Sequence, residues 1–280
     1  MTTAEPARIS ASRAQQIASL AEQIALRAFP HGRVEPEQIA AEEGISFCYA
    51  SFAEQLDGAL VHAGGKFIIF CNERRSPRGS PRSRFTFAHE LGHYFIADHR
   101  RAVVAGKLGA RFPRSEFAWD RTFEKEADVF AANLLMPAAL FKHGRRHVPN
   151  GLKRVGALAA TFGTSWVAAA YRAIELDLVS APCAVFQWDE FGDPIGRKMS
   201  PVTFHLSLPF AGTTPRPPPE SVTARAIDRL LRWPMQRVIK GTAWFPQLDL
   251  TDDFYGVELR EEVMALGSNG WLTLVHASAP

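Results

Sequence analysis

The residues of this chain that could do chemistry gather at positions 85–94, which contain His89, Glu90 and His93 in the spacing His-Glu-x-x-His. Two histidines four residues apart lie on one face of an α-helix, one turn apart, so their imidazoles can converge on one ion. Zn²⁺ suits two neutral imidazoles best, because it has no geometric preference of its own. Glu90 lies off the metal axis, from where it can reach a water on the ion. Two ligands and one general base in this order are typical of a metalloprotease.

The residues around this motif indicate that its helix is buried. Apolar side chains occupy most sides of the segment: Phe85, Phe87, Ala88, Leu91, Phe95 and Ile96. Histidines and a carboxylate inside a buried helix need partners, because an unpaired buried polar group is costly. The flanking sequence therefore favours a metal site over a pair of core histidines.

A catalytic zinc site takes a third protein ligand and leaves the fourth position for water, and the chain offers two candidates. The first is His99, ten residues after His89, which is the spacing of the third histidine in HExxHxxGxxH. That motif needs a glycine where this chain has Ile96, and a β-branched residue does not readily take the positive φ of the sharp return. We therefore expect His99 to be a polar residue near the end of the helix.

The second and preferred candidate is Glu124, in a segment at residues 122–137 that predicts another buried helix, ended by a proline. Glu124 and Asp128 are four residues apart and share one face of that helix. We expect Glu124 to bind the metal. We expect Asp128 to hold the free ring N–H of a histidine ligand, His93, and so to fix its tautomer. Glu126 points elsewhere and is expected to be a solvated charge.

The two motifs together resemble those of the ImmA/IrrE metallopeptidases. The resemblance is carried by His89-Glu-Leu-Gly-His93 and by the run Glu-x-Glu-Ala-Asp-x-Phe-Ala-Ala-x-Leu-Leu-Met-Pro that begins at Glu124. It also takes in residues 85–88 and a predicted hairpin between residues 57 and 72, and it covers roughly residues 12–178. Enzymes of this family are of the gluzincin type, in which HExxH is followed by ExxxD.

The resemblance implies a role for each matching position. His89, His93 and Glu124 correspond to the metal ligands. Glu90 corresponds to the catalytic base, and Asp128 to the carboxylate that holds the ring of a ligand. The implied metal is Zn²⁺, and Mn²⁺ can replace it in a site of two histidines and one glutamate. Members of the family are intracellular endopeptidases that cut helix-turn-helix repressors and so switch on stress or mobile-element genes. Such a repressor is therefore the expected protein substrate.

Two other functions stay open. One is a transcriptional regulator that binds a repressor or DNA without cleaving it, in which the metal would be structural. An intact Glu90 argues against it, because a purely structural site has no use for a base. The other is a small-molecule hydrolase on the same site, and here the predicted hairpin upstream favours a peptide.

Composition places the chain among ordinary globular proteins. Its 280 residues are 46% hydrophobic and 22% charged, and the net charge of +3 is too small to make nucleic acid the expected main partner. The three cysteines are far apart, which excludes a cysteine zinc site and fits free thiols in a reducing compartment. No apolar run is long enough to cross a bilayer, and the N-terminus lacks a signal-peptide pattern. We therefore expect a cytoplasmic protein that makes no membrane contact.

Hydrophobic periodicity and turn residues indicate an α+β fold with two domains. We expect a zincin-like metallopeptidase domain, mostly helical with a small sheet, at residues 1–180, and a smaller α+β accessory domain, sensory or substrate-presenting, at residues 181–280. Strands 58–62 and 66–71 should form a hairpin packed on the HExxH helix, where an edge strand could pair with an extended peptide. The helix-turn-helix pattern at 152–178 is too apolar to enter a DNA groove, so we expect it to pack on the catalytic domain and not to bind DNA.

The remaining segments predict a second α+β module and one arginine-rich loop. Residues 74–84 hold five arginines and two prolines, and we expect an exposed loop, either simply solvated or forming an electrostatic patch beside the cleft. In the second domain we expect a hairpin of strands 183–188 and 195–199, a helix at 222–233, and strands at 242–245, 255–259, 262–266 and 271–275.

Overall fold

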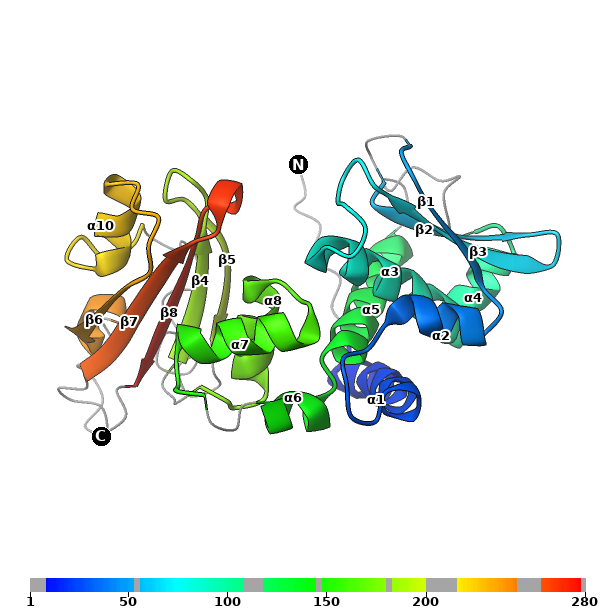
Figure 1. The fold of residues 1–280 in the computed structure, drawn as a ribbon, viewed down its shortest axis with the longest axis horizontal. Helices are drawn as coiled ribbons and strands as arrows, with labels where there is room; N and C mark the ends of the chain where they lie inside the picture. The colour runs from blue at the N-terminus through cyan, green and yellow to red at the C-terminus, as the bar shows by residue number, and fades with distance from the viewer. Residues whose placement is uncertain are drawn as a thin grey trace. The chain divides into compact units, whose positions relative to one another are not determined.

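The structure is a computed structural model that describes residues 9–52, 56–107, 118–144, 148–179, 183–199, 216–245 and 258–277. The chain forms two compact units, residues 1–143 with 160–165 and residues 144–159 with 166–280. Helices and two sheets make up the described part, as expected for an α+β fold (Figure 1). None of the helices in these ranges is both long and apolar enough to cross a membrane.

The first unit contains a small sheet and a group of helices (Figure 1). In chain order its elements are α1 (Ala11–Ala28), α2 (Pro36–Glu42), β1 (Ser46–Ala50), β2 (Gly58–Ala63), β3 (Lys66–Asn72), α3 (Pro81–Phe95), α4 (Ala97–Val104), α5 (Ala118–Leu135) and α6 (Ala138–Gly144). Helix α3 carries the HExxH residues. It begins where the sequence permits a helix to begin, because Pro81 needs no N–H partner at the first position and the Ser80 hydroxyl accepts from the Ser83 N–H.

The sheet of the first unit has the strand order β1-β3-β2. Strands β2 and β3 form the predicted antiparallel hairpin, with Gly58 opposite Cys71, and its turn residues Gly64 and Gly65 take φ values of 57° and 74°. A turn with positive φ at both central positions matches the twist of a two-residue hairpin, which explains the two glycines. Strand β1 pairs with β3 in parallel. Strands β1 and β2 therefore form the two edges.

Helix α5 lies between α1 and α3 and contacts both. Its apolar face is fully buried at Ala127, Phe130, Ala131 and Leu134. The facing residues are equally buried, at Phe87 and Leu91 on α3 and at Ile17 and Ala21 on α1. The i, i+3, i+4, i+7 spacing of these residues is the pattern from which two buried helices are predicted. Helix α3 also contacts β2 and β3, so the sheet covers the side of α3 turned away from α5.

The second unit is built on a five-stranded antiparallel sheet with the order β5-β4-β8-β7-β6. Its elements are α7 (Leu152–Phe162), which begins in this unit, α8 (Trp166–Glu175), β4 (Cys183–Trp188), β5 (Pro194–Met199), α10 (Val222–Asp228), β6 (Met235–Lys240), α11 (Gly241–Trp244), β7 (Glu258–Ala265), the 3₁₀ turn η4 (Gly267–Asn269) and β8 (Trp271–Ala277). The predicted hairpin β4–β5 is present, and β7 pairs with β8 in a second one. Strand β7 is continuous over Glu258–Ala265, so residues of the two strands expected at 255–259 and 262–266 belong to one strand.

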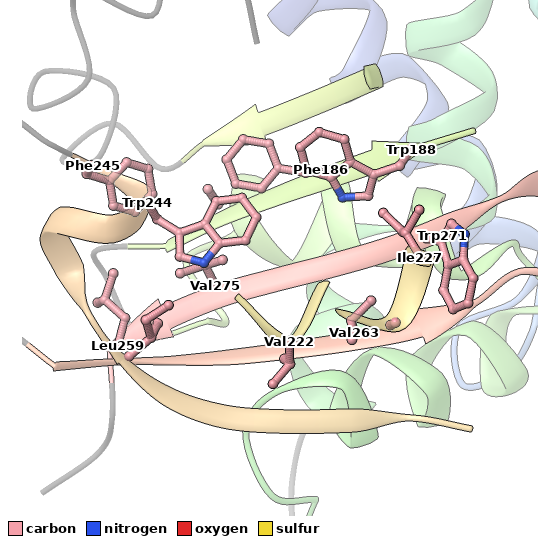
Figure 2. Close-up of a cluster of buried hydrophobic side chains, with 13 residues drawn as sticks. Phe186, Trp188, Val222, Ile227, Trp244, Phe245, Leu259, Val263, Trp271 and Val275 are labelled. Carbon is pink, nitrogen blue, oxygen red and sulfur yellow. The ribbon is translucent and has the colours of Figure 1, made fainter. Parts of the chain in front are cut away.

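Both faces of the central strands are covered. One face carries the aromatic core shown in Figure 2, where the Phe186 ring stacks on those of Trp188 and Trp244, and residues of α10 belong to the same buried cluster. Helix α8 contacts β4, β5 and β8. Strands β4 and β8 are consequently buried along nearly their whole length, and burial does not alternate along either strand.

The structure differs from the expected organisation of the second half in three further places. The units divide near residue 144 and not at residue 180, because the apolar face of α8 packs on the second sheet. Residues 242–245 belong to helix α11 and its C-cap, not to a strand, and β6 precedes them. The helix expected at 222–233 ends at Asp228, and Leu230 then takes a positive φ of 50°. Residues 255–257 of another expected strand lie outside the described ranges.

Candidate metal centre

Two neighbouring helices bring together three of the residues that the sequence singles out. His89 and His93 lie one turn apart on α3, and Glu124 faces them from α5. The two Nε2 atoms are 3.1 Å apart. The Glu124 carboxylate lies 3.4 Å from His89 Nε2 and 3.5 Å from His93 Nε2. The first contact is to Oε2 and the second to Oε1, so two ring nitrogens and the carboxylate group face a common point.

The spacing of these donor atoms suits a small cation. Zinc ligands at about 2.0–2.1 Å in tetrahedral geometry lie about 3.3–3.4 Å from one another. The Nε2–Nε2 distance of 3.1 Å is close to that edge length, and so are the two nitrogen–oxygen distances of 3.4 and 3.5 Å, each to a different oxygen of Glu124. Two imidazoles and one carboxylate are also the donor set of catalytic zinc sites, which leave a fourth position for water. The residues present therefore fit Zn²⁺, and Mn²⁺ accepts the same donors.

A glycine between the two histidines lets the helices approach. A Cβ at Gly92 would lie 3.2 Å from the Ala127 Cα and 3.2 Å from the Phe130 Cβ. Contacts this short are rarely tolerated, so a larger residue would push α5 away from α3. Because Glu124 is one turn before Ala127, this close approach also sets the distance between the carboxylate and the histidines.

Glu90 lies on the side of α3 that faces strand β2. It is 7% exposed, and burial raises the pKa of its carboxyl group, although His93 and His89 oppose that shift. The main-chain N–H of Leu60 donates a hydrogen bond to the carboxylate. A Cβ at Gly58 would lie 2.6 Å from Thr86 Cγ2 and 3.2 Å from Glu90 Oε1, so this glycine is needed for the strand to lie so near the carboxylate. A raised pKa suits a group that takes and returns a proton.

Asp128 holds His89, not His93 as the sequence analysis expected. His89 Nδ1 lies 2.9 Å from Asp128 Oδ1. Burial disfavours the charged imidazole, but the hydrogen bonds to Asp128 and Glu124 outweigh it and raise the pKa of His89 to about 10. The same contacts act on Glu124, where burial is outweighed by the two histidines and the pKa falls well below its usual range. A metal would have to displace a proton from this site.

The second ring nitrogen of His93 faces His99. The two Nδ1 atoms are 3.1 Å apart, and His99 Nε2 lies 3.1 Å from Glu126 Oε2. Burial and the neighbouring His93 lower the pKa of His99 to about 4. Glu126 is 5% exposed, so it is not the solvated charge that the sequence analysis expected, and His99, expected as a polar residue near the end of the helix, is fully buried on α4. The burial of Glu126 could have been predicted from the sequence, because it lies one turn before Phe130 on the apolar face of α5.

Several arginines of the segment 74–84 make ion pairs or ring contacts within the first unit. Arg75 and Arg82 both bind Asp57, and Arg78 lies over the Tyr49 ring. Arg84 is 2% exposed, since it belongs to α3 and pairs with Glu35, which corrects the expectation that it lies in an exposed loop. Part of the positive charge is thus neutralised within the unit, which weakens the interpretation of this segment as an electrostatic patch.

Comparisons with known proteins bear on both units. A sequence profile described as the IrrE N-terminal-like domain (Peptidase_M78) matches residues 40–173. No curated protein matches the sequence. A Mycobacterium tuberculosis protein described as a transcriptional regulator has a similar structure, with a TM-score of 0.59 and 14% identity over 95% of this chain and 78% of that one. At this identity the likeness concerns the fold alone.

Proposed function

We propose that this chain is a zinc-dependent endopeptidase of the ImmA/IrrE family with His89, His93 and Glu124 as the metal ligands, because residues 40–173 match the IrrE N-terminal-like domain. The observation that carries this proposal is the convergence of those three side chains at 3.1–3.5 Å, beside a buried Glu90 on the same helix. Asp128 orients His89 through its Nδ1 atom. A structural zinc site would have no need of Glu90.

The ion and Glu90 would have separate tasks in the reaction. A zinc ion in the site would supply Lewis acidity to a peptide carbonyl and lower the pKa of water. Glu90 would take the proton of the attacking water and pass it to the leaving amine. Burial raises the pKa of Glu90, which suits a group that accepts a proton and then passes it on. Hydrolysis then needs no further proton carrier from the chain.

The substrate would bind as an added strand. In the order β1-β3-β2, β2 is an edge strand, and it lies against the catalytic helix α3. An extended peptide can pair with the free main-chain groups of such an edge. Leu60 on β2 donates to Glu90, so a peptide paired there would run beside the base. The proposed substrate is a helix-turn-helix repressor, whose cleavage would relieve repression, for instance in a stress response.

The experiment is to replace Glu90 with Gln and to measure zinc content and peptide cleavage together. We expect Glu90→Gln to keep one zinc per chain and its fold but to lose cleavage of candidate repressors. Glu73→Gln, at an exposed carboxylate in the same unit, is the matched control and should cleave normally. Cleavage by Glu90→Gln at the wild-type rate would refute the proposed role of the base.

The alternative is a regulator that binds a repressor or DNA without cleaving it. The observation in its favour is the fold shared with a protein described as a transcriptional regulator. On this hypothesis wild type and Glu90→Gln would bind a repressor or operator equally and cleave neither. The same pair of proteins therefore separates the two functions.

We also propose that the protein acts in the cytoplasm. Cys48, Cys71 and Cys183 are all free in the structure, which suits a reducing compartment. If cells are lysed directly into denaturant that contains an alkylating agent, all three cysteines should be recovered as alkylated thiols. A disulfide recovered in that experiment would argue for an oxidising compartment.

A further inference from the structure

A line of buried polar side chains runs from His93 away from the proposed metal position. His93 Nδ1 lies 3.1 Å from His99 Nδ1, and His99 Nε2 lies 3.1 Å from Glu126 Oε2. Arg13, on α1, closes the line with its Nε 3.1 Å from Glu126 Oε1 and its Nη2 2.7 Å from Glu126 Oε2. Asp98 holds the same Nη2 at 3.1 Å. Four helices contribute to this line.

The hydrogen bonds along this line can have only one direction if His93 binds a metal. His93 Nε2 faces Glu124 and His89, so the proton of a neutral His93 must be on Nδ1. His99 Nδ1 then accepts that proton's hydrogen bond, and His99 Nε2–H donates to Glu126. The carboxylate can only accept, and Arg13 donates to both of its oxygens. Each group thus fixes the protonated atom of the next.

Packing makes this line rigid. The Phe123 ring stacks on His99 with centroids 4.2 Å apart and an interplanar angle of 17°. His99 is fully buried and Glu126 nearly so, which excludes water as a substitute partner for either. A buried carboxylate without its cation is strongly unfavourable, so Glu126 depends on Arg13. The polar groups and the stacked ring together leave His99 one position.

We propose that His99, Glu126 and Arg13 are positioning residues that fix the tautomer and direction of His93, and that Arg13 makes helix α1 part of the metal centre. Helix α1 lies outside residues 40–173, which the family profile matches. The contribution of Arg13 therefore comes from outside the matched domain. The inference rests on the proposed metal site and is independent of whether the chain cleaves peptides.

Zinc affinity, measured by competition with a chromogenic chelator, is the quantity that a merely structural role would not change. His99→Phe keeps the ring on Phe123 but removes both nitrogens, and it should weaken zinc binding by about 10–100-fold. His99→Gln can accept from His93 and donate to Glu126, so it should recover most of that loss. Glu126→Gln, which keeps the shape of the side chain, should weaken zinc binding in the same direction. Urea unfolding of the metal-free variants shows that each is folded.

Two arginine variants on α1 test whether this helix contributes to the positioning of His93. Arg13→Gln should weaken zinc binding by about threefold to tenfold, less than the histidine change, because it acts two hydrogen bonds further from the metal. Arg27 lies in the last turn of α1 with its side chain 69% exposed, and Arg27→Gln is the matched control that should leave zinc affinity unchanged.

The outcomes separate this inference from the proposed function. Folded His99→Phe and Arg13→Gln proteins that bind zinc within twofold of wild type would overturn the positioning role. A loss confined to His99→Phe would overturn the part that includes α1. A wild-type protein that binds no zinc would overturn the metal site, and the positioning role with it. A protein that shows the expected affinities but cleaves no peptide would keep the positioning role and overturn the endopeptidase.

Discussion

Gly92→Ala tests how the two ligand-bearing helices are held together. Gly92 lies between the histidine turns of α3, and an added Cβ would lie 3.2 Å from the Ala127 Cα and 3.2 Å from the Phe130 Cβ. Ordinary contacts between carbon atoms are about 3.5–4.0 Å. The methyl group would therefore overlap α5 by several tenths of an ångström. The Ala127 Cα belongs to the main chain and cannot rotate away, so α5 must move.

Two opposing terms set the change in the free energy of unfolding. Replacing glycine by alanine inside a helix stabilises by about 1 kcal/mol, while overpacking a tight contact costs about 1–3 kcal/mol. We expect the metal-free protein to lose about 1 kcal/mol of stability. The movement of α5 would also draw Glu124 away from the histidines. A tenfold loss of zinc affinity would remove about 1.4 kcal/mol of zinc-dependent stabilisation at fixed free zinc.

The assay is urea unfolding, once with EDTA and once with buffered free zinc. The chain has two compact units, and the transition that shifts with zinc identifies the first. Gly32→Ala is the control, because a Cβ there meets nothing within 4 Å, and its effect should stay within about 0.5 kcal/mol. If Gly92→Ala instead stabilised the metal-free protein by about 1 kcal/mol and kept the full zinc effect, the argument from helix spacing would be refuted.

Three further predictions concern the metal site and the second unit. Glu124→Ala should carry no zinc after dialysis, and one retained zinc per chain in elemental analysis would contradict the ligand set. Zinc affinity should rise about tenfold per pH unit from pH 7 to 9, because the pKa of His89 is raised to about 10 in the metal-free protein and zinc must displace that proton. Calorimetry in buffers of different ionisation enthalpy should then show about one proton released at pH 7, and no release would contradict it. Trp188→Phe should cost about 1 kcal/mol more in urea unfolding than Trp244→Phe, since the Trp188 indole N–H donates to Thr273 whereas that of Trp244 has no acceptor among the described residues. Equal losses would count against this.

The local features of the site follow from regular geometry and could be predicted. His89 and His93 share a helix face because four residues complete about one turn, and Glu124 and Asp128 do so for the same reason. The hairpin β2–β3 was predictable because Gly64 and Gly65 supply the positive φ values of its turn. In each case the local geometry depends on residues only a few positions apart, so it can be read from the sequence.

Other features depend on which residues meet across the packed unit. Glu126 is two residues from Asp128, yet it is buried against His99 while Asp128 is exposed and holds His89. The relative rotation of α3 and α5 decides this, and that rotation depends on the contacts of α5 with α1 and of α3 with the sheet. Helix α11 shows the same limit in the second unit, because a short run of aromatic residues suits a strand or a helix until its neighbours are known.

The sequence by itself determined that two helices carry histidines and carboxylates in a spacing typical of a metal site, because helical periodicity places those side chains without reference to the rest of the chain. Only the tertiary structure decided that Asp128 holds His89, that His99 lies against His93, and that Arg13 reaches Glu126 from a distance of 113 residues along the chain. Hydrogen bonds between helices depend on crossing angles and close contacts such as that at Gly92, and these arise only when the whole unit packs.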